Sequence, residues 1–174
     1  GAFYMAGAYA AFFLIERLGF NYWLAMAGAA LAVALLSVLA ERLVFHPLRQ
    51  APYLHHMIAS IGILLFLESG VQALWGADFH RMATPYSQIL SFGGVTLPAQ
   101  RLLIILAAFV LVLLLQLFLK KTITGATIVA MAQSRDGAAL VGIDANRVAM
   151  LTFAIAGVLA AMAAVLYAPI NLVY

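Results

Sequence analysis

Residues 102–119 read LLIILAAFVLVLLLQLFL, and this charge-free run ends abruptly at Lys120 and Lys121. The hydrocarbon core of a bilayer is about 30 Å thick and takes roughly 20 apolar residues to cross as a helix. Lipid offers no partners to backbone N–H and C=O groups, so a helix is the expected structure because it satisfies these groups internally. Strands of a membrane barrel would alternate polar and apolar residues, whereas this run is apolar throughout. Residues 102–119 are therefore predicted to span a membrane.

Four further apolar runs accompany this one, and they are residues 1–15, 22–40, 57–75 and 148–168. Because the sequence starts with Gly1 rather than Met, we interpret the first and shortest run as a helix whose beginning lies outside these residues. The last run is followed by Pro169, which cannot continue a helix without losing a hydrogen bond. The pattern predicts an all-α polytopic transmembrane helical bundle of about five spans, organised as a single domain over residues 1–174.

The composition excludes most other classes of protein. Of the 174 residues, 67% are hydrophobic and 9% are charged, and the mean hydropathy is +1.09. A soluble domain is nearer about 45–50% apolar and 25% charged, so a secreted disulfide domain, a disordered tail and almost any soluble enzyme are excluded. The sequence has no cysteine, which removes disulfides, thiol catalysis and cysteine-bound zinc. A net charge of +3 is too small to indicate a nucleic-acid partner.

The basic residues between the spans indicate an orientation. Segments 41–56 and 120–147 are two crossings apart and share a side, and they carry Arg42, Arg49, Lys120, Lys121, Arg135 and Arg147. The opposite side, segments 16–21 and 76–101, carries Arg17, Arg81 and Arg101. Because cytoplasmic loops are enriched in Lys and Arg, the side with six basic residues is predicted to be cytoplasmic.

The two long connections differ in character. Residues 76–101 contain Pro85, a Gly93-Gly94 pair and Pro98, which are turn signals, and we expect an external loop there. Residues 120–147 instead predict two short helices folded back at the cytoplasmic surface, because apolar residues recur at helical spacing from Ile128. The expected caps are Ser134 or Asp136 before the second helix, Gly142 after it and Asp144 before the last span.

Small residues gather on two of the spans. They are Ala25, Ala29 and Ala32 beside Gly28 on the second span, and Ala156, Ala160 and Ala164 beside Gly157 and Ala161 on the last. Small residues at this spacing let helix backbones approach closely. We expect close packing within one subunit, with contact between subunits as the alternative.

The sequence lacks the motifs of catalysis, nucleotide binding and metal binding. Gly137 and Gly142 have the spacing of a P-loop, but Ile143-Asp144 follow in place of its Lys and Ser/Thr. The histidines, which are His46, His55, His56 and His80, show no ligand spacing. We therefore expect no catalytic residue, no metal and no cofactor on this chain.

Glu68 is the one ionisable residue inside a predicted span. An acid within a membrane is costly unless it faces protein or water. Two interpretations remain open: Glu68 lines a substrate path or holds a cation, or it packs helices together through a hydrogen bond to a neighbour such as Gln72 or Gln116.

Several motifs resemble the permease subunits of branched-chain amino acid ABC importers, most closely the LivH type. In the cytoplasmic segment they are Thr124-Gly125, Ala130-Met131-Ala132-Gln133, Arg135, Ala138-Ala139-Leu140, Gly142-Ile143-Asp144 and Arg147, followed by Leu151-Thr152-Phe153-Ala154. Upstream they are Gly7-Ala8-Tyr9, Glu41-Arg42, Pro47-Leu48-Arg49, Ile58-Ala59-Ser60-Ile61-Gly62 and Glu68. The chain departs from the family at Ala126 and Val129, where the family usually carries Arg, and at His46, which replaces the arginine before Pro47.

The resemblance implies a transport subunit of the bacterial inner membrane and no bond chemistry. It implies a second permease subunit, two ATPase subunits that bind the ATP, a periplasmic substrate-binding protein and surrounding lipid. In such importers a short cytoplasmic helix pair of the permease docks on the ATPase. The residues expected to make this contact are Ala132, Gln133, Ser134, Arg135, Asp136, Ala139 and Leu140. The polar residues expected to line a largely apolar substrate path are Ser60, Glu68 and Thr152.

Three alternatives remain open for the function. Permeases of this family also serve urea and short amides, so the substrate class is not fixed. A stand-alone secondary transporter or channel would carry charges in several spans and an inverted repeat, whereas this chain has one buried acid and no visible repeat. An integral membrane enzyme would need a catalytic set of residues, and none is found.

Overall fold

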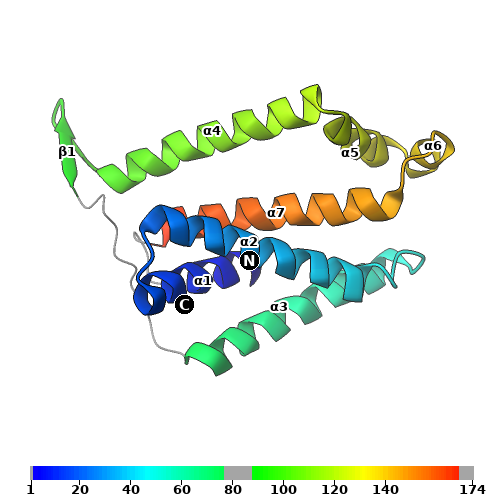
Figure 1. Ribbon diagram of the computed structural model, residues 1–174, viewed down its shortest axis with the longest axis horizontal. Coiled ribbons are helices and arrows are strands. Elements are labelled where there is room, and N and C mark those ends of the chain that lie inside the picture. Colours follow the sequence, from blue (N-terminus) through cyan, green and yellow to red (C-terminus); the bar gives the residue numbers. More distant parts are fainter. Residues whose placement is uncertain (1, 77–87, 169–174) are drawn as a thin grey trace.

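The computed structural model of the chain describes residues 2–76 and 88–168. The helices are α1 (Ala2–Leu18), α2 (Tyr22–Ala40), α3 (Tyr53–Trp75), α4 (Ala99–Lys121), α5 (Ile123–Gln133), α6 (Arg135–Leu140) and α7 (Ala145–Tyr167). A π-helical turn, η1 (Glu41–Phe45), continues α2, and strands β1 (Ile89–Phe92) and β2 (Val95–Pro98) precede α4. Figure 1 shows α5 and α6 at one end of the bundle and the strands at the other; we call these the α6 end and the hairpin end.

Four helices in the described part of the chain are long and apolar enough to cross a membrane: α2 with η1, α3, α4 and α7. They correspond to four of the five predicted spans, and α3, α4 and α7 each begin a few residues earlier than predicted. The run over residues 1–15 forms α1, which has 17 residues and is not among the four. The predicted stop at Pro169 lies outside the described residues, and α7 ends at Tyr167.

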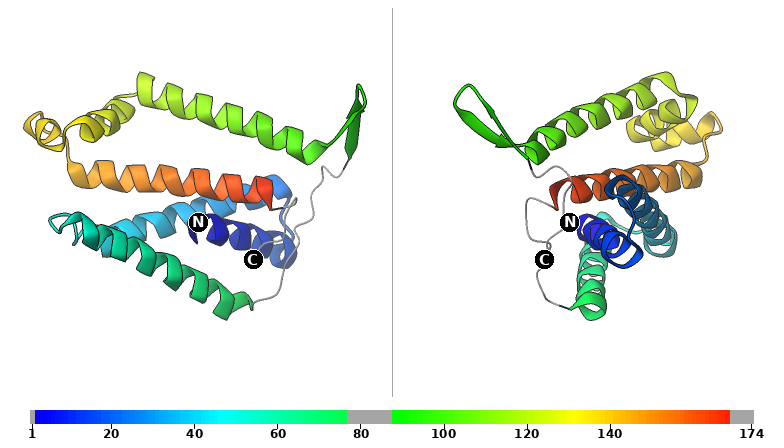
Figure 2. Two further views of the ribbon diagram at one scale, coloured as in Figure 1. Left: turned by 180° about the vertical axis from the view of Figure 1, so that it is seen from behind. Right: turned by 60° about the vertical axis from the view of Figure 1, so that its left-hand side comes forward.

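The packed centre of the molecule lies between α2, α7 and α1, which run side by side in both figures of the whole chain (Figures 1 and 2). Ala25 and Ala29 on α2, and Ala161 and Ala164 on α7, are completely buried. An alanine-sized Cβ at Gly7 would lie 2.8 Å from the Cα of Ala161, so α1 approaches α7 backbone to backbone. Small residues therefore make this close packing possible, as expected for helices in a membrane.

The contact face of α7 contains some, but not all, of the small residues predicted for it. Gly157 and Ala161 are buried, whereas Ala156 is exposed and Ala160 is only partly covered. Gly157 faces the Ser37 side chain of α2, because a Cβ added at Gly157 would collide with the Ser37 Oγ. The predicted close packing within one chain is thus confirmed. Of the small residues named for α7, Gly157, Ala161 and Ala164 are buried, whereas Ala156 and Ala160 are not.

Helices α3 and α4 lie at the periphery of the bundle. No residue of the most apolar window of α4 is buried, and only 6% of the corresponding window of α3 is buried. Helix α3 packs on α1, where the Trp75 ring lies 6.0 Å from the Tyr9 ring and 6.2 Å from the Phe13 ring. Both helices therefore present most of their apolar surface to the surroundings.

The all-α class predicted for the chain holds, and the connection before α4 adds a short two-stranded antiparallel hairpin. Residues 76–101 were expected to form an external loop; Ile89 instead pairs with Pro98, and Ser91 pairs with Thr96. The turn residues Gly93 and Gly94 have φ of 59° and 86°. Positive φ at both central residues matches the type I′ turn that suits the twist of a hairpin. The predicted turn at this pair is confirmed, and the predicted turn at Pro85 lies outside the described residues.

Buried polar groups join the helices at the hairpin end. The Tyr22 hydroxyl donates to the carbonyl oxygen of Val165 at 2.9 Å. The Gln100 amide, which is 3% exposed, donates to the carbonyl oxygen of Leu166 at 2.7 Å and to the Tyr22 hydroxyl at 3.3 Å. These bonds fix the first turn of α4 against the ends of α2 and α7.

Candidate functional site

The segment between α4 and α7 forms the two short helices predicted for it. Thr122 caps α5, because its Oγ1 accepts the Gly125 N–H at 3.0 Å and donates to the Phe118 carbonyl oxygen. The chain reverses so tightly here that a Cβ at Gly125 would lie 2.6 Å from the Cα of Leu119. Helix α5 is therefore folded back directly against the end of α4.

The second short helix, α6, is defined at both ends by local hydrogen bonds. The Ser134 Oγ accepts the Gly137 N–H at 3.1 Å, so Ser134, and not Asp136, is the N-cap. At the other end, the Gly142 N–H donates to the Ala139 carbonyl at 3.1 Å, and Gly142 has a φ of 84°. The next N–H, that of residue 143, reaches the carbonyl of residue 138 at 3.1 Å, which completes a Schellman motif.

Helix α7 begins directly after this motif. The Asp144 carboxylate accepts the Asn146 N–H at 2.9 Å and caps the helix as predicted. Only Ile143 separates Gly142 from this cap. The α5–α6 pair is therefore connected to α4 and to α7 by very short segments of chain.

The residues predicted to contact an ATPase form a continuous exposed surface over the end of α5 and the whole of α6. The exposed members are Ala132, Gln133, Ser134, Arg135, Asp136, Ala139 and Leu140. Ala138 alone points inward, and it is 3% exposed. The tip is apolar, because Leu140 is 88% exposed and Val141 is 76% exposed. The contact with an ATPase remains a prediction, and the structure provides a projecting surface for it.

A polar network that the sequence did not predict joins η1 to the first turn of α7. Glu41, in η1, is 1% exposed, and its Oε1 accepts a hydrogen bond from Arg49 and forms an ion pair with it. A second guanidinium nitrogen of Arg49 donates to the Oδ1 of Asn146 in the first turn of α7. The Glu41 Oε2 has no hydrogen-bond partner among the described residues, so Arg49 alone offsets the cost of burying this carboxylate.

Three further contacts join η1 to α3 and α7. The Phe45 ring lies 5.3 Å from the Phe153 ring of α7 and stacks at 6.5 Å on His56 of α3. Arg42 approaches the Met150 sulfur at 3.9 Å. We call these contacts, together with the Glu41–Arg49–Asn146 network, the α2–α7 joint. The joint places segments 41–56 and 120–147 at the same end of the bundle, as the span count predicted.

The three residues predicted to line a substrate path are not brought together. Ser60 and Thr152 are exposed, and each donates its hydroxyl to the carbonyl four residues back in its own helix, at 2.7 and 2.8 Å. Glu68 is exposed on α3. Helix α3 packs on α1 and η1, whereas Thr152 lies on α7, which packs mainly on α2 and α1. A path lined by all three residues therefore remains a prediction.

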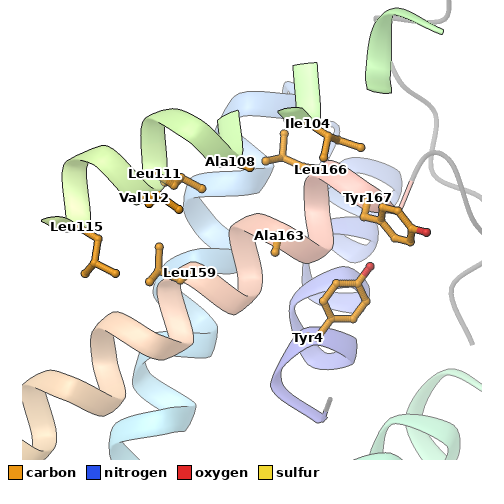
Figure 3. Close-up of a pocket in the computed structure, with 10 residues that line it drawn as sticks. All are labelled: Tyr4, Ile104, Ala108, Leu111, Val112, Leu115, Leu159, Ala163, Leu166 and Tyr167. Carbon is orange, nitrogen blue, oxygen red and sulfur yellow. The ribbon is translucent and has the colours of Figure 1, made fainter. Parts of the chain in front are cut away.

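An apolar groove separates the middle of α4 from α7. Its volume is about 610 Å³, and Leu111, Leu115, Leu159 and Ala163 form part of its walls. Figure 3 shows these walls, with the Tyr4 and Tyr167 rings at one end of the groove. Neither this groove nor a second one of about 390 Å³ further along the same helices is lined by Ser60, Glu68 or Thr152.

Metal binding finds no support among residues 2–76 and 88–168. No three His, Cys, Asp or Glu side chains in these ranges are placed to hold a metal ion together. His80 lies outside them. The Gly137–Gly142 stretch, which has P-loop spacing, forms α6 and its terminal turn.

Comparison with known proteins gives a consistent result over the whole chain. The family described as branched-chain amino acid transport system / permease component matches residues 1–173. The high-affinity branched-chain amino acid transport system permease protein BraD of Pseudomonas aeruginosa is 31% identical over 95% of this chain. The LivH proteins of Salmonella typhimurium and Escherichia coli K12, whose names describe the same transport system, are each 27% identical over 95% of the chain.

The chain spans 58% of the length of each of these relatives. No solved structure matches it. The four apolar helices and the family match make it a multi-pass membrane protein. The chain belongs to the branched-chain amino acid transport permease family.

Proposed function

We propose that this chain acts as a membrane-spanning permease subunit of an ATP-driven ABC importer in the bacterial inner membrane. The observation that carries the proposal is the α5–α6 pair, which projects an exposed surface from one end of the bundle and is joined to two spans by very short segments. A stiff element that is short and attached at both ends can pass a displacement to those spans. Family membership supports the same function.

The proposed assembly contains a second permease, two ATPase subunits that bind ATP and a periplasmic substrate-binding protein. The apolar tip formed by Leu140 and Val141 would enter a groove of the ATPase, while Arg135 and Asp136 provide polar contacts around it. Such an interface, with an apolar centre and a polar rim, is typical of protein–protein contacts. The chain would carry no catalytic residue and no cofactor of its own.

The proposed substrates are branched-chain or related amino acids, as the names of the relatives state for those proteins. Urea or short amides are the alternative within the same family. Ser60, Glu68 and Thr152 remain candidates for the path, and Glu68 is the one whose replacement by Gln is expected to change transport most, since it is the acid within a span.

The first test measures assembly. The full-length protein is co-expressed with its companion permease and both ATPases, and the ATPases that co-purify are quantified. Changing Arg135 and Asp136 together to Ala is expected to lower ATPase recovery, because both side chains are exposed on α6. Arg147→Ala is the matched control, since Arg147 is 82% exposed at the same end but lies beyond α6. Equal recovery from both variants would contradict the proposed docking surface.

The second test measures orientation and energy source. The 174 residues contain no cysteine, so Ser134→Cys introduces a single thiol into this part of the protein. The thiol is expected to react with an impermeant reagent only after the inner membrane is opened; labelling in cells with an intact inner membrane would place α6 outside and refute the proposal. Uptake of leucine by vesicles of the lone subunit without ATP would instead favour a stand-alone transporter, and uptake displaced by urea would favour the amide substrates.

A further inference from the structure

The contacts of the α2–α7 joint fall on one face of α7. Arg49, Arg42 and Phe45 reach Asn146, Met150 and Phe153, respectively. These three positions are spaced i, i+4 and i+7, so they form a single stripe along the first turns of the helix. The stripe begins only four residues after Gly142, where the terminal motif of α6 ends. Any displacement of α6 must therefore act on the part of α7 that the joint holds.

The α5–α6 pair is attached to the bundle unequally on its two sides. On the α7 side, Arg49 links α7 to η1 by hydrogen bonds, and the Phe45 ring of η1 contacts Phe153 of α7 and His56 of α3. On the α4 side, the most apolar window of α4 has no buried residue, and the described polar contact of α4 with the bundle is at Gln100, at the far end. Figures 1 and 2 show α4 diverging from the other helices.

The backbone at the joint contains a π-helical turn. Helix α2 does not end at Ala40 but continues as the π-helical turn η1, where the His46 N–H donates to the Glu41 carbonyl at 2.7 Å. Such turns insert an extra residue into a helix and occur often at functional sites. Here the turn places Glu41 in the interior and Phe45 between α3 and α7. One short segment thus connects three helices.

We propose that the contacts of the α2–α7 joint transmit a displacement of α6 to the other helices of the bundle. In this proposal Arg49 is the positioning residue, because it keeps α7 and η1 moving together. The inference rests on the proposed function, because it assumes that an ATPase moves α6. Arg49 suits this role, since its planar guanidinium binds two partners in fixed directions, a carboxylate on η1 and an amide on α7. Helix α4 then follows the movement without transmitting it.

The test uses the full-length permease assembled with its companion subunits and measures substrate imported per ATP hydrolysed. Arg49→Met alone would leave the buried Glu41 unpaired, which endangers folding. The informative variant is therefore the double change Glu41→Met and Arg49→Met, because replacing both partners of a buried ion pair by apolar residues is generally tolerated. Arg49→Lys keeps the charge but cannot bind both partners in the same geometry. Arg147→Gln, an exposed arginine next to Asn146, is the control.

The double variant is expected to keep its ATPase subunits and its basal ATP hydrolysis, while substrate imported per ATP falls about fivefold or more, which is the lower range for loss of an energetic coupling. Arg49→Lys is expected to restore only part of the loss, and Arg147→Gln to leave the ratio unchanged. A double variant that imports as much substrate per ATP as the unaltered protein would overturn the inference.

A second measurement is independent of the ATPase. Spin labels at Ala139 on α6 and at Tyr53 at the start of α3 report the distance between α6 and the rest of the bundle in the permease alone; both positions are exposed. The double variant is expected to broaden this distance distribution. If the double variant broadens the distribution but no ATPase binds the permease, the joint positions α6 and the proposed function is wrong. If the distribution in the double variant stays as narrow as in the unaltered protein, the joint does not position α6, and the inference fails independently of the function.

Discussion

Gly157 lies at a close contact between α7 and α2, and its replacement by alanine tests the packing that holds the bundle together. The added Cβ would collide with the Ser37 Oγ and would lie 3.0 Å from both the Ser37 Cβ and the Val33 carbonyl oxygen. The serine side chain can rotate only by giving up its 2.8 Å bond to that carbonyl. The carbonyl belongs to the backbone of α2, so the two helices must separate to make room.

The magnitude follows from two opposing terms. Overpacking a well-packed contact by one methyl group costs about 1–3 kcal/mol. Alanine is better than glycine inside a helix by about 0.5–1 kcal/mol. Because one obstacle is a backbone atom that cannot move alone, we expect the packing term to fall in the upper part of its range, and Gly157→Ala to lower the free energy of unfolding by about 1–2 kcal/mol.

Gly70→Ala on α3 is the matched control. Its added Cβ would meet no atom within 4 Å, so only the helix-propensity gain of about 0.5–1 kcal/mol applies. Both variants of the full-length protein would be unfolded in mixed micelles by titration with sodium dodecyl sulfate and followed by circular dichroism. Adding Ser37→Ala to Gly157→Ala is expected to recover part of the loss. Equal stability of Gly157→Ala and Gly70→Ala would refute the close α2–α7 contact.

Three further predictions concern single hydrogen bonds and one turn. Gln100→Leu leaves the buried Leu166 carbonyl without its 2.7 Å donor and is expected to cost about 1–3 kcal/mol in the same unfolding assay; an unchanged midpoint would contradict the bond. Ser134→Ala removes the N-cap of α6 at a cost of about 1 kcal/mol, and hydrogen exchange at the Gly137 amide is expected to accelerate; unchanged exchange would mean that the cap is absent. Gly142→Ala forces a side chain into a φ of 84° at about 1–2 kcal/mol, so exchange should accelerate across α6, and protection equal to that of the unaltered protein would argue against the Schellman motif.

Features that depend on neighbouring residues were predictable from the sequence. The terminal glycine at Gly142 and the cap at Asp144 follow from local chemistry, and the structure confirms both. Of the two N-caps that the sequence allowed for α6, Ser134 and Asp136, the structure selects Ser134. The hairpin was predictable in the same way but was missed. Two glycines at positions 93 and 94 between apolar runs are a recognised hairpin signal, and the prediction used them only as a turn.

The α2–α7 joint could not be predicted from local pattern. Arg49 and Asn146 are 97 residues apart, and nothing in either neighbourhood indicates the other. The signal that did exist was the position of Glu41, an acid directly at the end of an apolar run. Such an acid is usually assumed to face the aqueous phase, but the π-helical turn directs it into the interior, where Arg49 is its one ion-pair partner within residues 2–76 and 88–168. The π-helical turn therefore makes Glu41 a buried residue, although its position in the sequence suggests an exposed one.

The buried face of each span was the hardest feature to predict, because the spans are surrounded by lipid and not by water. In water, a helix reveals its buried face because the exposed face must be polar. In lipid both faces are apolar, and close packing is signalled only by small residues. On α7 such residues include those at 156, 157, 160, 161, 163 and 164, so neighbouring faces carry nearly the same signal. In the structure, the burial of Ala161 and the close approach of Gly157 to Ser37 distinguish them. The same ambiguity explains why Ser60, Glu68 and Thr152 could be placed on spans but not on a common path. The hydroxyls of Ser60 and Thr152 each donate to a carbonyl oxygen of their own helix. A polar residue in a span therefore does not by itself identify the face that meets a substrate.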